Sequence, residues 1–185
     1  MKFDLRLLEK KEFLLSHKNE EWFDIYDKHR QKIGKAPRSV CHGRTFLLHR
    51  VVHLLVFNSL GQILLQKRQM SKKIQPGKWD TSVGGHIATE ETTQLALQRE
   101  SIEELGLDIK ACKIKFLYDY IMISNIEKEW VFTFFTKWDG PFHHQVEEIS
   151  ELRFWDFDEI RDKRESGIFT PNFLDEFDRF TKIKI

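Results

Sequence analysis

Cysteine, proline and long apolar runs are scarce in this chain, and each shortage excludes a class of protein. Among 185 residues there are two cysteines, Cys41 and Cys112, and four prolines. Two cysteines cannot build the dense disulfide framework of small secreted domains, so we expect two free, reduced thiols. No apolar run is long enough to cross a bilayer. The opening segment, MKFDLRLLEKKEFLL, carries charges throughout, so we expect no secretory signal and a cytoplasmic protein.

An excess of charge of either sign is also missing. Thirty basic and 29 acidic residues give a net charge of +1. This balance gives no reason to expect nucleic acid or an anionic membrane as the main partner. No repeat, low-complexity tract or linker interrupts the sequence, and its length suits one domain with its own core. We therefore predict a single domain over residues 1–185, which includes an N-terminal arm over about residues 1–35.

The order of strand-like and helix-like patterns predicts an α/β fold. The runs VVHLLVF and QILLQKR are separated by NSLG and predict a β-hairpin. Aromatic and β-branched residues predict further strands over Trp22–Tyr26 and over residues 113–123, 129–138 and 151–157. The segment TPNFLDEFDRFTKI predicts an amphipathic helix that begins near Pro171. Strands and helices mixed in this order imply a mixed β-sheet covered by helices.

A pair of glycines precedes a helical pattern in the stretch GGHIATEETTQLALQRESIEELGL, residues 84–107. Gly84 and Gly85 predict a turn, which can bring bare backbone close to a ligand. Thr92 is the expected N-cap of the helix, and Gly106 is the expected residue just beyond its C-terminus. The helix is therefore expected to begin soon after a loop that suits ligand binding.

Three carboxylates fall on one face of this helix, where like charges repel each other. Glu100, Glu103 and Glu104 share roughly a third of the helix circumference. The residues expected to pack against a sheet on the opposite side are Leu95, Ile102 and Leu105. A solvated acidic face is one interpretation of such a charge run. A hard divalent cation bound through oxygen is the other, because it would relieve the repulsion.

The same stretch resembles the Nudix box, in which residues of fixed type recur at fixed spacing. The matching residues, within positions 85–107, are Gly85, Glu91, Arg99, Glu100, Glu103, Glu104, Gly106 and Leu107. Ser101 is the one departure, since an apolar residue is usual at its position. By this resemblance Glu91 and Arg99 have a structural role, in which they orient the loop and the helix.

The resemblance also implies a fold, an activity and a cofactor. The fold is the Nudix fold, an α/β/α sandwich, and the activity is cleavage of a diphosphate linkage in a nucleoside diphosphate or a related substrate. The implied cofactor is Mg²⁺ or Mn²⁺, bound by the Gly85 carbonyl and by Glu100, Glu103 and Glu104, which are the candidate catalytic residues. The metal would activate a water molecule, and a carboxylate such as Glu100 would accept the water's proton.

A wider region, from about Arg38 to Glu129, resembles the isopentenyl diphosphate isomerases that share the Nudix fold. In those enzymes three histidines and two glutamates bind a divalent metal. The matching residues, which imply a second metal site, are His42, His49, His86, Glu127 and Glu129. The residues that match the diphosphate-binding cations are Arg38, Arg68 and Lys72. His42 and His49 also fit turn or structural roles, and the loop KRQMSKK also fits a solvated segment.

Three functions are compatible with these patterns, and hydrolysis fits best. The isomerases use a cysteine just before the Gly-His pair, and here that position is Gly84, which cannot act as an acid or a base. Their box is degenerate and keeps mainly the glutamate matched by Glu104, whereas this chain has the full acidic set. The full set also disfavours a non-catalytic binding module. The substrate is not specified, because selectivity in this family lies in loops outside the box, and a homodimer remains open.

Overall fold

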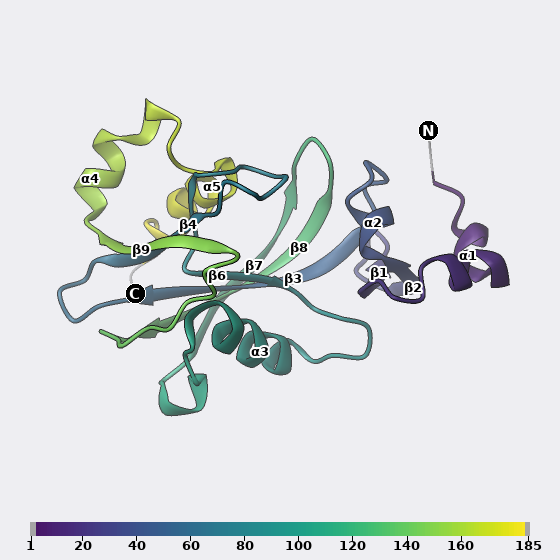
Figure 1. Ribbon diagram of the computed structural model, residues 1–185, viewed down its shortest axis with the longest axis horizontal. Helices are drawn as coiled ribbons and strands as arrows, with labels where there is room; N and C mark the ends of the chain where they lie inside the picture. Colours follow the sequence, from purple (N-terminus) through teal and green to yellow (C-terminus); the bar gives the residue numbers. More distant parts are fainter. Residues whose placement is uncertain (1–2, 184–185) are drawn as a thin grey trace. The chain divides into compact units, whose positions relative to one another are not determined.

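A computed structural model (Figure 1) describes residues 3–183, which divide into two compact units. Unit 1 comprises Met1–Val52, His86–Ala96 and Asp119–Phe132. Unit 2 comprises His53–Gly85, Leu97–Tyr118 and Thr133–Ile185. Several strands and one helix contribute residues to both units, and the prediction of a single domain stays a prediction.

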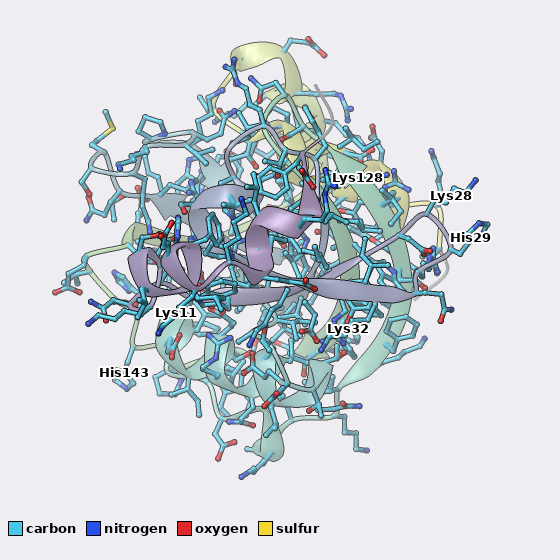
Figure 2. The ribbon with its side chains drawn as sticks, turned by 90° about the vertical axis from the view of Figure 1, so that its right-hand side faces the viewer. Lys11, Lys28, His29, Lys32, Lys128 and His143 are labelled. Carbon is cyan, nitrogen blue, oxygen red and sulfur yellow. The ribbon has the colours of Figure 1, made fainter. Side chains whose placement is uncertain are left out.

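Unit 1 is built on two short strands that pair beside the first half of a long one. β1 (Trp22–Tyr26) pairs antiparallel with β2 (Lys32–Pro37) and with β3 (Leu48–Phe57), so the strand predicted at Trp22–Tyr26 is confirmed. Within the β1–β3 pairing, Ile25 lies opposite His49. Lys28 and His29 are exposed in the turn between β1 and β2 and point away from the ribbon (Figure 2).

The remaining elements of unit 1 are helical and enclose a small core. They are the 3-10 helix Leu5–Glu9, α1 (Lys11–Ser16) and α2 (Arg38–Cys41). The core residues are Leu8, Phe23, Ile25, Ala36 and Cys41. Cys41 and Cys112 are both free, as predicted.

The sheet is large and mixed. Its other strands are β4 (Ile63–Arg68), β5 (Trp79–Asp80), β6 (Val83–His86), β7 (Lys115–Ile123), β8 (Lys128–Lys137) and β9 (Ile149–Trp155). The pairing order is β2-β1-β3-β4-β5, while β6 and β8 also pair with β3, β7 pairs with β8, and β9 pairs with β4. The antiparallel pairing of Phe57 with Ile63 confirms the predicted hairpin, and a parallel bridge joins Trp79 to Phe169.

Helices lie on both sides of the strands in unit 2, as an α/β/α sandwich requires. The helices are α3 (Thr93–Leu105), α4 (Phe157–Asp162) and α5 (Pro171–Phe180), with 3-10 helices at Ile109–Ala111 and Arg164–Ser166. Figure 1 shows α3 and α5 on opposite sides of these strands. The predicted helix at Pro171 is confirmed, and the Thr170 hydroxyl caps it by accepting the Phe173 N–H. Within residues 3–183, every helix is too short or too polar to cross a membrane.

An aromatic core fills the space between α5 and the strands of unit 2. From α5 it takes Phe173, Phe177 and Phe180, which pack with Trp79 and Trp155. These phenylalanines recur at helical spacing, so one face of the helix is apolar and can be buried on the sheet. This packing fixes α5 against the strands that carry the candidate site.

Two predictions about the region of the box are wrong. Gly84 and Gly85 do not form a turn, because they lie within strand β6, and the positive φ of 67° falls later, at Glu90. Leu95 and Ile102 do not face the sheet, since they are 60% and 48% exposed.

The buried face of α3 is instead rotated toward the carboxylates. Besides Leu105, which was predicted correctly, Ala96, Leu97, Ser101 and Glu104 are buried. Leu97, Ser101 and Leu105 follow one another at intervals of four residues and define this face. The polar Ser101 conceals the stripe in the sequence, which is why the exposed Leu95 and Ile102 were assigned to it.

Candidate active site and metal centre

The box carboxylates in unit 2 lie against the backbone of β6. Glu104 is buried, and its Oε2 atom accepts hydrogen bonds from the Gly84 N–H at 3.1 Å and from Gln66 Nε2 at 2.8 Å. Glu100 sits over Gly85 so closely that a Cβ atom there would lie 1.9 Å from Glu100 Cδ. The second glycine is therefore needed because Glu100 occupies the space that any side chain at residue 85 would fill.

Arg99 offsets part of the carboxylate repulsion. Its Nη1 atom donates to Glu100 Oε1 at 2.6 Å and to Glu103 Oε2 at 3.3 Å. The side chain of Glu103 is 51% exposed, so it stands at the solvent side of the group while Glu104 stands at the buried side. The structure thus brings Glu100 and Glu104 to β6 and leaves Glu103 at the rim.

Glu91 lies in unit 1 and closes the turn that follows β6. Its Oε2 atom accepts the Ala88 N–H at 2.9 Å, and its carbonyl accepts a hydrogen bond from Arg50 Nη2 at 3.2 Å. The first contact binds the Glu91 side chain to the backbone of its own turn, and the second binds the Glu91 backbone to Arg50 on β3. These contacts suit an orienting role.

The electrostatics of the carboxylate group favour a bound cation. Burial, reinforced by the nearby Glu100 carboxylate, raises the pKa of Glu104 to about 8. A divalent cation would favour the charged form, and a donor set of carboxylates with a backbone carbonyl suits a hard ion such as Mg²⁺ or Mn²⁺. Because Gly85 has no side chain, the Glu100 carboxylate can lie against the backbone of β6. This arrangement fits the metal that the Nudix box implies.

Arg68 and Lys72, the cations predicted to contact phosphate in unit 2, are both held by carboxylates. Arg68 Nη1 lies 3.3 Å from Asp80 Oδ2, and Lys72 Nζ lies 2.5 Å from Glu148 Oε1. Glu148, which directly precedes β9, was not identified from the sequence. Its carboxylate also contributes to the raised pKa of Glu104, which places it near the box.

A second group of ligand-type atoms comes together in unit 1, and we name His42, His49, His86, Glu127 and Glu129 the His/Glu cluster. One donor atom from each of the first four lies within 4.8 Å of the others. His42 contacts His86 at 3.1 Å, Nε2 to Nε2, and Glu127 at 3.2 Å, Nδ1 to Oε2. Glu129 Oε1 lies 3.7 Å from His86 Nε2 and 4.0 Å from His49 Nε2.

The surroundings of this cluster prepare it for a cation. The Nδ1 atom of His49 contacts the Leu47 carbonyl at 2.9 Å, which turns Nε2 toward the cluster. That Nε2 is buried and has no hydrogen-bond partner among residues 3–183. Phe23 stacks on His49 and His86 with ring centroids 5.4 and 4.5 Å away. A buried nitrogen without a hydrogen bond is costly, and a bound metal would satisfy it.

Burial also keeps His42 and His49 neutral, as ligation requires. It lowers the pKa of His42 and of His49 to about 4, and the positive charge of Arg38 acts in the same direction. Arg38 itself lies on α2, where its guanidinium is 2.9 Å from Glu21 Oε2. Burial and then Glu127 raise the pKa of Cys41 to about 12, so this thiol stays protonated and is a poor nucleophile.

Metal affinity of the His/Glu cluster should therefore persist to lower pH than for ordinary histidines. Unperturbed imidazoles would lose a metal below about pH 6.5. With pKa values of about 4, His42 and His49 should compete with protons only as the pH approaches 4. Titration with Co²⁺ between pH 4 and 7, followed by visible absorption, measures this, with His49→Gln as the control that lacks one nitrogen ligand. An affinity that falls with a midpoint near pH 6.5 would contradict the expectation.

Comparison with known protein families identifies one family to which this chain is similar. The model of the NUDIX domain matches residues 47–177. The chain belongs to the Nudix family. An uncharacterized Nudix hydrolase of Listeria monocytogenes is 35% identical over 160 residues, which cover 84% of this chain and 90% of that protein. The resemblance inferred from the box is therefore confirmed, and the protein is a Nudix-type hydrolase.

Two further similarities concern the isomerase-like group and the fold. An isopentenyl-diphosphate Delta-isomerase of Photorhabdus laumondii is 33% identical over 131 residues, which cover 70% of this chain and 73% of that enzyme. A crystal structure from Deinococcus radiodurans superimposes with a TM-score of 0.77 at 23% identity and covers 86% of this chain and 98% of that one. The Nudix fold and the isomerase-like grouping are thus both confirmed.

Proposed function

We propose that this Nudix hydrolase cleaves a diphosphate linkage in a nucleoside diphosphate or a related small molecule and requires Mg²⁺ or Mn²⁺. The proposed metal ligands are the Gly85 carbonyl and the carboxylates of Glu100, Glu103 and Glu104. The observation that carries this proposal is the close seating of Glu100 over Gly85 beside the buried Glu104. No excess positive charge favours nucleic acid, and the two free cysteines support a cytoplasmic location.

The residues of the chain divide the chemistry between them. A bound divalent cation supplies charge for the phosphoryl oxygens and lowers the pKa of a coordinated water. Glu100 accepts a proton from the attacking water, whose oxygen bonds to phosphorus as the bridging P–O bond breaks. Arg68 and Lys72 bind the non-bridging phosphate oxygens through charge-assisted hydrogen bonds. Arg99 holds Glu100 and Glu103 in place through its guanidinium.

The His/Glu cluster supports a second metal site within the same proposal. Three imidazoles, of which burial keeps those of His42 and His49 neutral, and two carboxylates suit a first-row divalent metal. This site is also the observation that favours the alternative function, isopentenyl diphosphate isomerisation, together with the Photorhabdus relative. Against it, Gly84 offers no acid or base where the isomerases have their cysteine. We therefore keep hydrolysis as the proposed function.

The two activities can be separated in one assay. The purified protein, with Mg²⁺ and separately with Mn²⁺, is incubated with a panel of nucleoside diphosphates, their derivatives and isopentenyl diphosphate. Phosphorus and proton NMR follow the products. We expect P–O–P cleavage of at least one panel member and no dimethylallyl diphosphate. Catalytic formation of dimethylallyl diphosphate without cleavage anywhere in the panel would establish the isomerase instead.

A further inference from the structure

Gln66 is a buried polar residue that follows an apolar run on β4. It comes directly after Ile63, Leu64 and Leu65 and is 6% exposed. Ile63 and Leu65 belong to the aromatic core that packs on α5. Because side chains alternate along a strand, Gln66 points to the opposite side of the sheet, where α3 lies (Figure 1). It lies outside the Nudix box, which spans residues 85–107, yet it faces the helix that carries the box carboxylates.

The amide nitrogen of Gln66 donates two hydrogen bonds inside unit 2. One goes to Oε2 of Glu104 at 2.8 Å, and the other goes to the Ser82 carbonyl at 3.4 Å. Ser82 is itself fixed, because its hydroxyl donates to the Leu64 carbonyl at 2.5 Å and accepts the Val56 N–H at 2.9 Å. A serine that joins β3 to β4 therefore holds the amide, and the amide holds the carboxylate.

The hydrogen bonds of Glu104 converge on one of its two oxygens. Oε2 accepts both the Gln66 amide, at 2.8 Å, and the Gly84 N–H, at 3.1 Å. Within residues 3–183, Oε1 accepts no hydrogen bond. Two donors on one oxygen fix the orientation of a carboxylate and leave the lone pairs of the other oxygen for a cation. The two oxygens of Glu104 therefore have different surroundings.

We propose that Gln66 is a positioning residue for the metal site, which keeps Oε2 of Glu104 on protein donors so that Glu104 binds the cation through Oε1 alone. This inference rests on the metal assignment within the proposed function and adds a residue from outside the box. Donors that contact a ligating carboxylate orient it, and their loss typically lowers metal affinity by about 10- to 100-fold. Without Gln66, only the Gly84 N–H holds Glu104, and either oxygen can turn to the ion.

Gln66→Met tests the proposal, because methionine adapts to the space of the glutamine and donates no hydrogen bond. Mn²⁺ affinity is measured by electron paramagnetic resonance, and circular dichroism checks the fold. The binding that Glu104→Gln removes belongs to the box, which separates it from binding at the His/Glu cluster. We expect this affinity to fall about 10- to 100-fold in Gln66→Met. The matched control is Gln98→Met on α3, which loses an exposed amide hydrogen bond to Asp108 at 3.0 Å and should leave the affinity unchanged.

Two further measurements separate positioning from a general structural role. A crystal structure of the Mn²⁺-bound wild-type protein should show Oε1 of Glu104 on the ion and Oε2 still on both donors. Turnover should also reveal coupling between the two residues. If Gln66 acts through Glu104, adding Gln66→Met to Glu104→Gln causes no further loss, whereas the fold-losses of independent residues multiply.

The outcomes are distinct. Lower Mn²⁺ affinity in Gln66→Met but not in Gln98→Met, together with Oε1 on the ion, supports the proposal. Unchanged or higher affinity in a folded Gln66→Met, an equal fall in Gln98→Met, losses that multiply with Glu104→Gln, or any other arrangement of Glu104 at the ion overturns it. If Gln66→Met does not fold, the Mn²⁺-bound wild-type structure decides alone. Mn²⁺ bound through Oε1 without hydrolysis of any substrate would reject the proposed function and leave this inference intact.

Discussion

Glu104→Gln is expected to reduce turnover on the order of a hundredfold or more while the protein stays folded. The amide is nearly isosteric, and its oxygen can still accept the Gly84 N–H that Glu104 accepts at 3.1 Å. The amide carries no charge to hold a divalent cation, so we expect weaker metal binding and slower hydrolysis. Steady-state kinetics at saturating Mg²⁺ measure the effect, and circular dichroism checks the fold. A folded variant with turnover close to the wild-type value would refute the metal assignment.

The same substitution should change the pH dependence of stability in the metal-free protein. The pKa of Glu104 is raised from 4.5 to about 8, so the native state holds a proton that the unfolded chain releases earlier. The stability contributed by this group is fully present below about pH 4.5 and is lost as the pH rises through 8. Glutamine removes that loss, so Glu104→Gln should gain relative stability between pH 6 and 9. Urea unfolding with EDTA measures it, and Glu103→Gln, at the exposed rim, should show no such gain.

Gly85→Ala should be the second most damaging change to activity. A methyl group at residue 85 would lie 1.9 Å from Cδ and 2.2 Å from Cγ of Glu100, so the carboxylate must leave its place on β6. The displaced atoms belong to a flexible side chain, and therefore the fold should survive. We expect Mn²⁺ affinity, measured by electron paramagnetic resonance, to fall together with turnover, each by on the order of a hundredfold.

The neighbouring glycine provides the matched control for that change. At residue 84 a Cβ atom would meet only ordinary contacts of 3.4 Å or more, with His53 and Thr81. Gly84→Ala should therefore lower Mn²⁺ affinity and turnover far less than Gly85→Ala does. Equal losses in the two variants would show that β6 tolerates no side chain at either position, and that the seating of Glu100 is not the reason.

Local patterns in the sequence were sufficient for elements whose signals are local. The hairpin between Phe57 and Ile63 and the helix at Pro171 follow from turn residues, β-branched runs and helical spacing, and both are confirmed. Two glycines in succession predicted a turn, but pairing of β6 with β3 prevailed. The helix face was wrong because Ser101, a polar residue, occupies a fully buried position.

Contacts between residues far apart in the sequence could not be predicted from such local patterns. The side chains of His53 and Glu176 are in hydrogen-bond contact although the residues are 123 positions apart, and no local feature of either segment relates one to the other. Glu148 lies near Glu104 only because of the fold, and its sequence context gave no sign of it. The His/Glu cluster, which spans positions 42 to 129, was predicted through resemblance to the isomerases and not from local periodicity.

Arg68 and Lys72 already hold internal counter-ions, Asp80 at 3.3 Å and Glu148 at 2.5 Å. A phosphate that binds these cations must therefore exchange with a carboxylate, and it gains only the difference between two ion pairs. An anion with a single charge matches what the carboxylate already provides and has little advantage over it. A diphosphate carries more charge and spans two positions, so it can displace both partners at once. If Arg68 and Lys72 bind phosphate as proposed, the two internal ion pairs would exclude weakly charged metabolites.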